Sequence, residues 1–365
     1  MRLQVTVIVP GHPLARYPPD ISLEMQLQEN IPLAPLTTFG IGGPARWFAE
    51  ANDEASVLEA VRLAQERGLP LFVLGGGSNV LVADEGYPGL VLHVALTGVE
   101  QAGDVFHAGA GENWDRFVSL AIDCGYGGIE CLAGIPGTVG GTPVQNVGAY
   151  GQEVSRTIVS VRVLDALHLA FADLPSEACG FGYRHSIFNS THRGRFIVTR
   201  VDYRLRRNAN PVLSYPDLAR AFDTGAQPSL SEAAAKVREI RRTKGMLLVE
   251  GDADCRSAGS FFKNPVVPEG LSEEIAAEAS SPVPRYAVAH GFVKIPAAWL
   301  VEQAGFRKGF ALGAAGISSR HTLALVNRGG ATAREILALR DQIVAAVEAR
   351  FGIRLEPEPV WVGAS

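Results

Sequence analysis

The sequence predicts an α+β protein with two structured parts. Segments of strand and helix character follow one another from about Asn30 to residue 206, and they include a strand–helix–strand unit at 45–77. A stretch at 208–229 that contains Pro, Asn and Gly then separates this part from one richer in helical patterns. The composition, 47% hydrophobic and 19% charged, is typical of an ordered protein with a sizeable core.

The first part combines amphipathic helices with short apolar strands. The run at 53–68 repeats apolar residues at helical spacing, with Asp53 as the expected N-cap and Gly68 as the stop. The run at 113–125 follows the same plan, with Asn113 as its N-cap. Strands are predicted at 45–51, 69–77, 89–96, 105–111, 158–165 and 195–206.

The second part contains longer helical patterns. Ser229 or Ser231 suits the start of one of them, and Pro296 suits the first turn of another. These patterns predict helices at 229–245, 296–309 and 331–352, and a closing strand at 354–363.

The N-terminal region differs from the rest. Residues 1–28 contain four prolines and little periodicity, which predicts a loose extension, and Met25 is a possible later start. No apolar run reaches the roughly 18 residues of a membrane span, and the N-terminal apolar run is too short for a signal peptide. We therefore expect a cytoplasmic protein that contacts no membrane.

Charge and cysteine content exclude two further classes. The net charge of −5 (33 basic minus 38 acidic residues) argues against a non-specific nucleic-acid binder, because such proteins need a basic face. The four cysteines form no C-x-x-C pair and have no histidine pair at zinc spacing, so we predict reduced thiols and no metal site. They are Cys124, Cys131, Cys179 and Cys255.

A glycine-rich turn leaves the strand predicted at 69–77. Gly75, Gly76 and Gly77 allow backbone N–H groups to crowd together and point at an anion, and Ser78 and Asn79 add side-chain donors. No lysine follows, so the turn is not a phosphate-binding Walker loop. Taken alone, a plain tight turn is the simpler explanation.

A second glycine-rich stretch changes that balance. The loop at 134–151 is long and almost uncharged, so we expect it to lie against something. Its glycines allow the backbone to approach a flat ring closely, and its amides offer hydrogen bonds to ring heteroatoms. Together the two stretches predict one large nucleotide cofactor, with an irregular surface loop as the alternative. The residues concerned are Gly134, Gly137, Gly140, Gly141, Gln145 and Asn146.

Three charged residues, at two places in the chain, are candidates for binding a carboxylate or shaping a site. Arg184 lies between Tyr183 and His185, which suits either a surface cation–π pair or a bidentate carboxylate clamp. Glu356 and Glu358 share one face of an extended segment, which suits either a solvated acidic edge or a site. The residues alone leave both alternatives open.

These stretches together resemble one family, the UDP-N-acetylenolpyruvoylglucosamine reductases of peptidoglycan synthesis, called MurB. The resemblance covers nearly the whole chain after the N-terminal extension, and the stretches fall in one order. They are "NIPLAPLTTFGIGG", "LGGGSNVLV", "AGAGENW", "GIPGTVGGTPVQNVGAYG", "FGYRHSIF", "AGSFFKNP", "PAAWLVEQAG" and "LEPE".

The resemblance implies an FAD-binding domain of the vanillyl-alcohol-oxidase type, in two subdomains, and a smaller α+β substrate-binding domain. On this basis we expect an extension at 1–29, the FAD-binding domain at 30–222 with 354–365 returning to it, and the substrate-binding domain at 229–352. The family uses non-covalent FAD and NADPH to reduce the enolpyruvyl group of a UDP-linked sugar, giving UDP-N-acetylmuramate for cell wall biogenesis and hence for cell shape and division. We also expect a monomer.

The resemblance also implies residue roles. Arg184, Ser260 and Glu358 occupy the family's catalytic positions. Tyr215, in "PVLSYPDL", matches the tyrosine that closes over the substrate in one of the two main family types. Contacts to the nucleotide portion of the substrate are expected from Lys244, Asn264 and Gln303.

Two departures from the family pattern adjoin Arg184. Family members often have Asp where this chain has His185, and many have Lys where it has Asn189. Neither position is catalytic in the family, so the departures bear on the orientation of Arg184.

The family's reaction suggests a chemical role for the motif "RSAGSFFKNP". Hydride addition to an enolpyruvyl ether creates an enolate-like charge, which needs a cation to stabilise it and an acid to protonate the adjacent carbon. Arg184 suits the first role, with Glu358 assisting, and Ser260 suits the second in a dry site. Phe261 and Phe262 are expected to pack and order the turn.

Two other classes of protein remain as alternatives. One is another oxidoreductase of the flavin superfamily, such as an oxidase, although no histidine lies in 134–151 to attach flavin covalently. The other is a nucleotide-binding module without activity. NADPH consumption with the enolpyruvyl substrate distinguishes all three.

Overall fold

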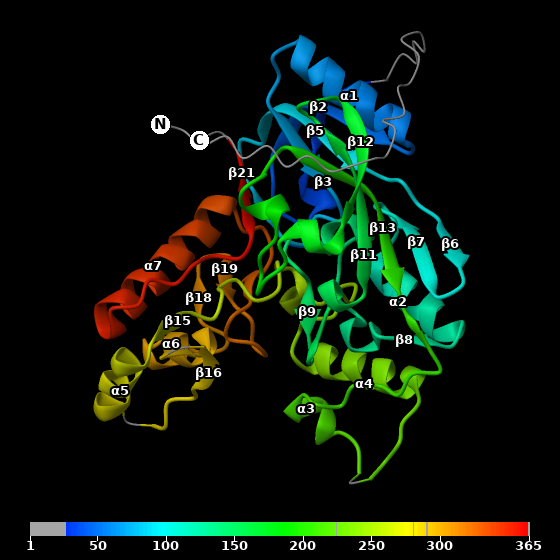
Figure 1. Cartoon of the computed structure of the whole chain (residues 1–365). Coiled ribbons are helices and arrows are strands. Elements are labelled where there is room, and N and C mark those ends of the chain that lie inside the picture. Colours follow the sequence, from blue (N-terminus) through cyan, green and yellow to red (C-terminus); the bar gives the residue numbers. More distant parts are fainter. Residues whose placement is uncertain (1–26, 224, 280, 290, 364–365) are drawn as a thin grey trace, which may run out of the picture.

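The computed structural model describes residues 27–223, 225–279, 281–289 and 291–363. Residues 266–353 form one side of the molecule, and the sheets of the preceding chain form the other (Figure 1). Most of the predicted extension, including Met25, lies outside the described residues. Among the described residues, none of the helices is long and apolar enough to span a bilayer.

The first sheet contains the predicted strand–helix–strand unit. Its central strands are parallel, as expected where a helix connects neighbouring strands, and an antiparallel strand closes one edge. The strand order is β1 (Gln28–Pro32), β2 (Pro44–Ala51), β5 (Tyr87–Val94), β3 (Leu71–Leu74), and the connecting helix is α1 (Glu54–Glu66).

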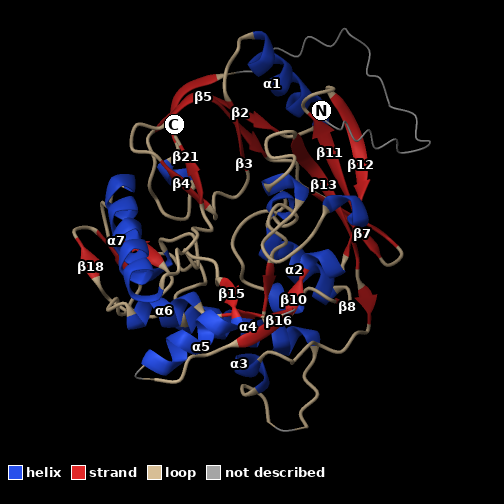
Figure 2. Ribbon diagram, turned by 60° about the vertical axis from the view of Figure 1, so that its left-hand side comes forward, coloured by secondary structure: helices blue, strands red, loops and turns tan. Residues whose placement is uncertain are grey.

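The second sheet is antiparallel throughout. Its strand order is β12 (Ala170–Pro175), β11 (Ile158–Asp165), β13 (Phe196–Arg204), β7 (Val105–Gly109), β6 (Val99–Ala102). Figure 2 shows these strands as one layer, with loops gathered between it and the C-terminal helices. Two helices, α2 (Trp114–Asp123) and α4 (Leu230–Thr243), pack against each other beside this sheet.

The C-terminal side combines two small sheets with three helices. The sheets are ordered β15 (Val266–Pro268), β17 (Phe292–Lys294), β16 (Tyr286–Ala289) and β18 (Ala311–Leu312), β19 (Ala315–Ile317), β20 (Leu325–Asn327). The helices are α5 (Glu269–Glu278), α6 (Ala297–Gln303) and α7 (Ala333–Phe351).

Short elements complete the fold. The last strand, β21 (Val360–Val362), pairs with β4 (Val80–Val82), which directly follows the first glycine-rich turn. The chain end therefore returns to the N-terminal side. The remaining pairs are β8 (Tyr126–Gly127) with β14 (Arg206–Arg207) and β9 (Gly148–Ala149) with β10 (Gln152–Glu153), and a short helix α3 spans Pro216–Ala219.

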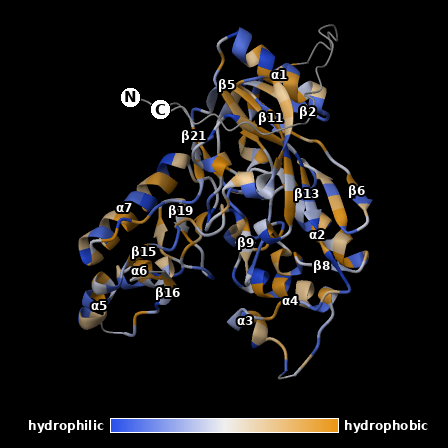
Figure 3. Ribbon diagram, viewed as in Figure 1, coloured by the Kyte–Doolittle hydropathy of each residue, from blue (hydrophilic) through white to orange (hydrophobic). Residues whose placement is uncertain are grey.

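Apolar residues form separate cores on the two sides. The larger core joins α1, α2, α4 and both N-terminal sheets, and the second core joins α6, α7 and the C-terminal sheets. Figure 3 shows the apolar residues concentrated on the strands, with hydrophilic residues on the outer faces of the helices. This separation leaves the loops between the two cores free to form a site.

The predicted helix starts agree with the structure. Asp53 and Asn113 are the N-caps of α1 and α2, and each side chain accepts a backbone N–H of the first turn. Of the two serines considered for α4, Ser229 is the N-cap, and Glu232 completes a capping box. These ends are encoded locally, which is why the sequence alone could predict them.

Other boundaries differ from the predictions. The helix expected at 296–309 ends at Gln303, because Gly305 has a left-handed φ of +97°. The strand expected at 354–363 is regular only at 360–362, after two prolines. Gln28 and Glu29, expected in the extension, belong to β1; both are exposed on an edge strand and lack the alternation that would reveal it.

Helix α4 also packs differently from the expected domain division. The prediction assigned it to the second domain, yet Leu230, Ala234 and Val237 are buried in the larger core. A helix's apolar face is readable from sequence, but the partner that covers it is not.

Candidate active site

The two glycine-rich stretches meet in the folded chain. A Cβ atom on Gly76 would lie 2.6 Å from the Cα of Gly137, and one on Gly137 would lie 2.8 Å from Oγ of Ser78. Gly77 adopts a left-handed φ of +61°, which a side chain would strain. The turn and the loop thus touch backbone to backbone and form one continuous surface, the backbone cradle.

Side chains of the two stretches are joined as well. Asn79 Nδ2 donates to Gln145 Oε1 at 2.9 Å and to the carbonyl of Glu358 at 3.3 Å. The Val360 N–H in turn donates to the carbonyl of Asn79. This network brings the chain end, the glycine turn and the second loop to one place.

Asn146 has a different position from Gln145. Its side chain is buried, donates to Glu153 and to the carbonyl of Gly182, and accepts the Ser155 N–H. The carboxamide is therefore occupied by protein groups and supports the loop that carries Arg184, so only its backbone remains to face a ligand.

The remaining predicted glycines differ in how closely the protein surrounds them. Gly134 accepts a hydrogen bond from Arg241 at 2.9 Å and donates to Asp115 at 2.6 Å, and Gly140 packs on Ala110. Gly141 is exposed, with no atom within 4 Å of an added Cβ.

We expect Gly76→Ala to lose most of its bound flavin and about 1–3 kcal/mol of unfolding free energy. The added methyl collides with the backbone of Gly137, so the two loops must separate. Flavin absorbance per chain and urea unfolding measure both effects. The matched control is Gly270→Ala, on the exposed side of α5 where nothing lies within 4 Å. Normal flavin content and stability in Gly76→Ala would contradict the proposed contact.

Arg184 stands in a tight turn held from both sides. Its φ of +53° is unusual for a non-glycine residue, and the Gly182 and His185 backbones bond to each other across the turn. Asn189 Nδ2 donates to the Arg184 carbonyl at 3.1 Å, while its Oδ1 accepts the Ser186 N–H. Thus Asn189, a departure from the family pattern, helps to fix the Arg184 backbone. The His185 backbone closes the turn, and its Nε2 lies 3.4 Å from Ser190 Oγ.

Arg184 and Glu358 form a largely buried ion pair. Arg184 Nε lies 3.0 Å from Glu358 Oε1, with the side chains 23% and 12% exposed. The Arg184 Nε–H has no well-aligned acceptor, whereas Nη2 donates to the Gly148 carbonyl at 3.1 Å. Because Nε is buried against Glu358, a bound carboxylate would have to use the N–H groups of the terminal guanidinium nitrogens.

The environment also acts on Glu358. Burial raises the pKa of its carboxyl group, against the opposing effects of Arg184 and Lys263. A carboxyl group whose pKa is raised by burial beside a charged partner is typical of a functional site.

Tyr183 connects the two sides of the molecule. The Arg184 guanidinium lies 5.6 Å from the Tyr183 ring centroid, and Lys294 Nζ, on β17, lies 4.8 Å from the same centroid. Sequence analysis missed Lys294, because nothing in "FVKIP" distinguishes it from a surface lysine.

The motif around Ser260 lies next to Glu358. Phe261 and Phe262 are each 2% exposed in the second core, as predicted. The Glu358 N–H donates to the Phe261 carbonyl at 2.8 Å, and Phe262 forms a bridge with Pro357. This pairing places the serine's segment beside the buried carboxylate.

Ser260 has a partner that the sequence analysis missed. Its Oγ lies 3.0 Å from Nε2 of His321. Burial, and then the cations Lys244, Lys308 and Arg241, lower the pKa of His321 to about 4. The signal available in the sequence was a histidine between two apolar strands, which is too common to single it out.

We expect the lowered pKa of His321 to make stability depend on pH. Between about pH 6.5 and pH 4 the unfolded chain binds a proton that the folded chain does not, so the unfolding free energy falls as pH falls. Urea unfolding of wild type across this window should show a loss of about 2–3 kcal/mol more than His321→Gln shows. Equal slopes in the two proteins would contradict the assignment.

Two of the predicted substrate residues lie together. Lys244 Nζ and Asp217 Oδ2 are 2.6 Å apart, and Asp217 is two residues after Tyr215. The Tyr215 ring packs edge-on against Tyr150 at 5.2 Å between centroids, and it remains 39% exposed. The ion pair between Lys244 and Asp217 thus anchors the loop of Tyr215, while the Tyr215 ring remains accessible.

The other two substrate residues lie at α6. Asn264 Oδ1 accepts the Ala297 N–H at 2.9 Å, at the start of the helix. Gln303 ends the helix, and its carbonyl accepts a hydrogen bond from Arg350. Within the described residues, no hydrogen bond or ion pair links Gln303 to the Lys244 and Tyr215 group, and its role stays a prediction.

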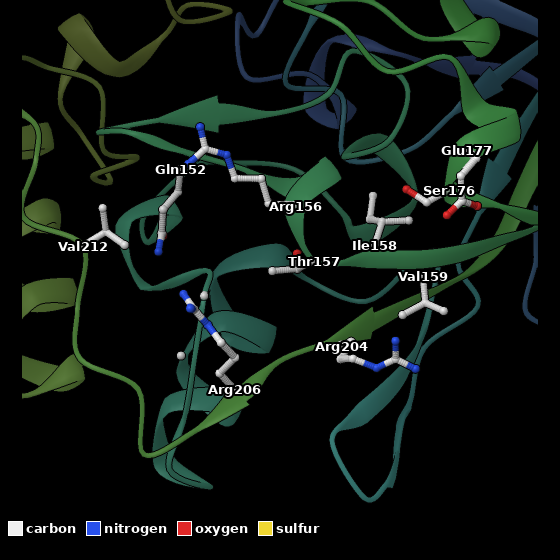
Figure 4. Close-up of a pocket in the computed structure, with 12 residues that line it drawn as sticks. Gln152, Arg156, Thr157, Ile158, Val159, Ser176, Glu177, Arg204, Arg206 and Val212 are labelled. Atoms are coloured by element: carbon white, nitrogen blue, oxygen red, sulfur yellow. The ribbon is translucent and has the colours of Figure 1, made fainter.

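A separate cavity of about 400 Å³ lies near β11 and the end of β13 (Figure 4). Arg156, Arg204, Arg206 and Glu177 are among its lining residues. None of the predicted site residues lines it, so it is not part of the arrangement described above.

Comparison with known proteins identifies the family. Residues 251–362 match the model of the UDP-N-acetylenolpyruvoylglucosamine reductase C-terminal domain, and residues 45–167 match that of an FAD binding domain. A UDP-N-acetylenolpyruvoylglucosamine reductase of Streptomyces coelicolor is 43% identical over 98% of this chain and 96% of its own length. One of Nocardia farcinica is 44% identical over 92% and 90%.

A solved structure agrees with these sequences. The crystal structure of UDP-N-acetylenolpyruvylglucosamine reductase (MurB) from Thermus caldophilus superposes with a TM-score of 0.63 and 27% identity, over 92% of this chain and 99% of that one. The predicted α+β class with an FAD-binding domain is confirmed. The chain belongs to the UDP-N-acetylenolpyruvoylglucosamine reductase family.

Proposed function

We propose that Arg184, Ser260 and Glu358 are the catalytic groups with which this chain carries out its family's reaction. That reaction is the NADPH-dependent, FAD-mediated reduction of UDP-N-acetylglucosamine enolpyruvate to UDP-N-acetylmuramate, in the synthesis of peptidoglycan precursors. The observation that supports these roles best is the buried Arg184–Glu358 pair, which borders the segment of Ser260.

The backbone cradle at Gly75–Gly77 and Gly137 fits FAD. Its two loops touch backbone to backbone, which added Cβ atoms would prevent, and its amides suit phosphates. Ser78, Asn79 and Gln145 supply polar side chains at its rim. When bound, FAD accepts a hydride from NADPH and supplies it to the enolpyruvyl double bond. No histidine lies in 134–151, in keeping with non-covalent binding.

Arg184 binds the substrate carboxylate. Hydride addition moves negative charge toward that carboxylate, and the partly buried guanidinium can stabilise this charge. Glu358 holds the guanidinium in place through their ion pair.

Ser260 donates the proton that completes the reduction. The acceptor is the carbon next to the carboxylate, which is basic enough for a hydroxyl to serve as the acid. The buried rings of Phe261 and Phe262 anchor this segment, which keeps Ser260 beside the segment of Glu358.

The nucleotide portion of the substrate lies toward Lys244. Lys244 and Arg241 are cations near His321, which suits a diphosphate. Tyr215 closes over the substrate in the manner of the tyrosine-loop type of the family. Asn264 and Gln303 complete the substrate contacts.

We also propose a domain division, a location and an oligomeric state for the protein. The FAD-binding domain contains 30–222 and the returning segment 354–365. We propose that the substrate-binding domain begins near 251 rather than at 229, because α4 packs into the larger core. The protein works as a cytoplasmic monomer.

Flavin analysis and turnover test this function together. Denatured protein should release FAD, and NADPH oxidation should require the enolpyruvyl substrate. Release of FMN, or absence of flavin after reconstitution, would contradict the cofactor. Consumption of NADPH or oxygen that does not depend on the enolpyruvyl substrate would indicate an oxidase. Bound FAD without any turnover would indicate a nucleotide-binding module.

A further inference from the structure

The partner of Ser260 comes from a distant part of the chain. His321 Nε2 lies 3.0 Å from Ser260 Oγ, across a separation of 61 residues. Such a hydrogen bond can orient the hydroxyl, and a hydroxyl that is to act as an acid needs its orientation controlled.

The turn that carries His321 is rigidly held. Ser318 Oγ accepts the backbone N–H groups of both Arg320 and His321. The Arg320 guanidinium binds Asp252, and its Nε lies 3.0 Å from Asp254 Oδ2. The carboxylates precede Ser260 in the chain, so this cluster ties the histidine's turn to the serine's own segment.

A second tie lies on the other side of the contact. The Phe261 N–H donates to the carbonyl of Leu323 at 2.7 Å. A backbone hydrogen bond therefore joins the residues that follow Ser260 and His321. The ion pairs of Arg320 join the segments that precede the two residues. Because these two sets of contacts hold both segments, the fold itself fixes the distance between Ser260 and His321.

The charge state of His321 limits what the contact can do. Burial and the nearby Lys244, Lys308 and Arg241 keep the imidazole neutral at neutral pH. A neutral imidazole has one N–H and one acceptor nitrogen. If Ser260 is to give its hydrogen to the substrate, Nε2 must carry the imidazole proton and donate to Oγ.

We propose that His321 is the positioning residue for Ser260, donating its Nε2–H to Oγ so that the hydroxyl hydrogen points at the substrate. In the step itself the O–H bond of Ser260 breaks and a C–H bond of the product forms. The electron pair of the O–H bond stays on Oγ, where the Nε2–H stabilises it, and water later returns a proton to Oγ. The inference rests on the proposed role of Ser260.

Two substitutions separate the hydrogen bond from mere packing. His321→Gln keeps a donor near the position of Nε2, whereas His321→Phe keeps the ring and removes the donor. We expect His321→Phe to slow flavin reoxidation by the enolpyruvyl substrate about 10- to 100-fold and His321→Gln to keep most of the rate. Flavin content and reduction by NADPH should stay normal in both. His168→Gln, on an exposed turn, is the matched control.

A double mutant distinguishes this inference from the role of Ser260. If His321 acts through Ser260, His321→Phe should have no further effect in a Ser260→Ala background. If His321→Phe lowers the rate by the same factor in the Ser260→Ala background as in the wild type, the positioning role is wrong and Ser260 remains the acid. A wild-type rate in Ser260→Ala alone would instead refute the acid itself.

Nitrogen NMR of the protein provides a readout apart from activity. In the protein without substrate, the signal that disappears in His321→Phe should show the Nε2–H tautomer at neutral pH and should shift in Ser260→Ala. An Nδ1–H tautomer would overturn the proposal, as would an unshifted signal. This measurement stands even if His321→Phe lowers stability, because His321→Gln also assigns the signal.

Discussion

Ser260→Ala should slow flavin reoxidation by the enolpyruvyl substrate by about 10²-fold or more, the usual effect of losing a positioned acid. Flavin binding and flavin reduction by NADPH should remain nearly unchanged, since the proton is needed only after hydride reaches the substrate. Stopped-flow measurement of flavin absorbance follows each half-reaction separately. Ser260→Cys should restore part of the rate, because a thiol can also donate a proton.

The control for this change is Ser231→Ala. Ser231 is exposed at the start of α4, and its loss should leave both half-reactions at the wild-type rate. If Ser260→Ala slows both half-reactions equally, the serine is structural. The hydroxyl would then serve the turn, and water or another residue would supply the proton.

Arg184→Lys should reduce turnover by about 10²-fold or more, although the positive charge is kept. A lysine lacks the planar fork that pairs with a carboxylate through two hydrogen bonds, and it cannot reach Glu358 and a substrate carboxylate together. Flavin content should not change, because Arg184 is outside the glycine cradle. Steady-state NADPH oxidation with the enolpyruvyl substrate measures the loss.

Arg204→Lys is the matched control for Arg184→Lys. Arg204 is 60% exposed and pairs with Asp104 at 3.5 Å on the surface, so the same exchange there should be silent. Near-normal turnover in Arg184→Lys would mean that the Arg184–Tyr183 contact is an ordinary cation–π pair and that the substrate carboxylate binds elsewhere.

The elements that the sequence predicted well are those encoded by local patterns. The strand at 158–165 has the predicted bounds, and α1, α2 and α4 begin at capping residues that were named from sequence. By contrast α5 and the edge strands β6 and β12 were not predicted. Strand β6 is short and mostly exposed, and β12 has one buried residue among partly exposed ones, so neither shows a clear apolar alternation in the sequence.

The candidate site was predicted largely through motifs, and the structure adds how the residues divide their work. Gln145 and Asn146 look equivalent in sequence, yet only Gln145 faces Asn79 while the Asn146 carboxamide braces the Arg184 loop. Asn189 looked like a departure and proves to hold the Arg184 carbonyl. Such differences depend on which backbone group lies opposite each side chain.

By itself, the sequence determined the α+β class, the helix starts, the two glycine stretches and the family to which they point. These follow from residue spacing and from backbone freedom, which act over a few neighbouring positions. The tertiary structure alone decided that α4 joins the larger core, that Arg184 meets Glu358, and that Ser260 meets His321. Those contacts join segments far apart in the chain, and their partners are selected by the packing of whole elements, which no local pattern records.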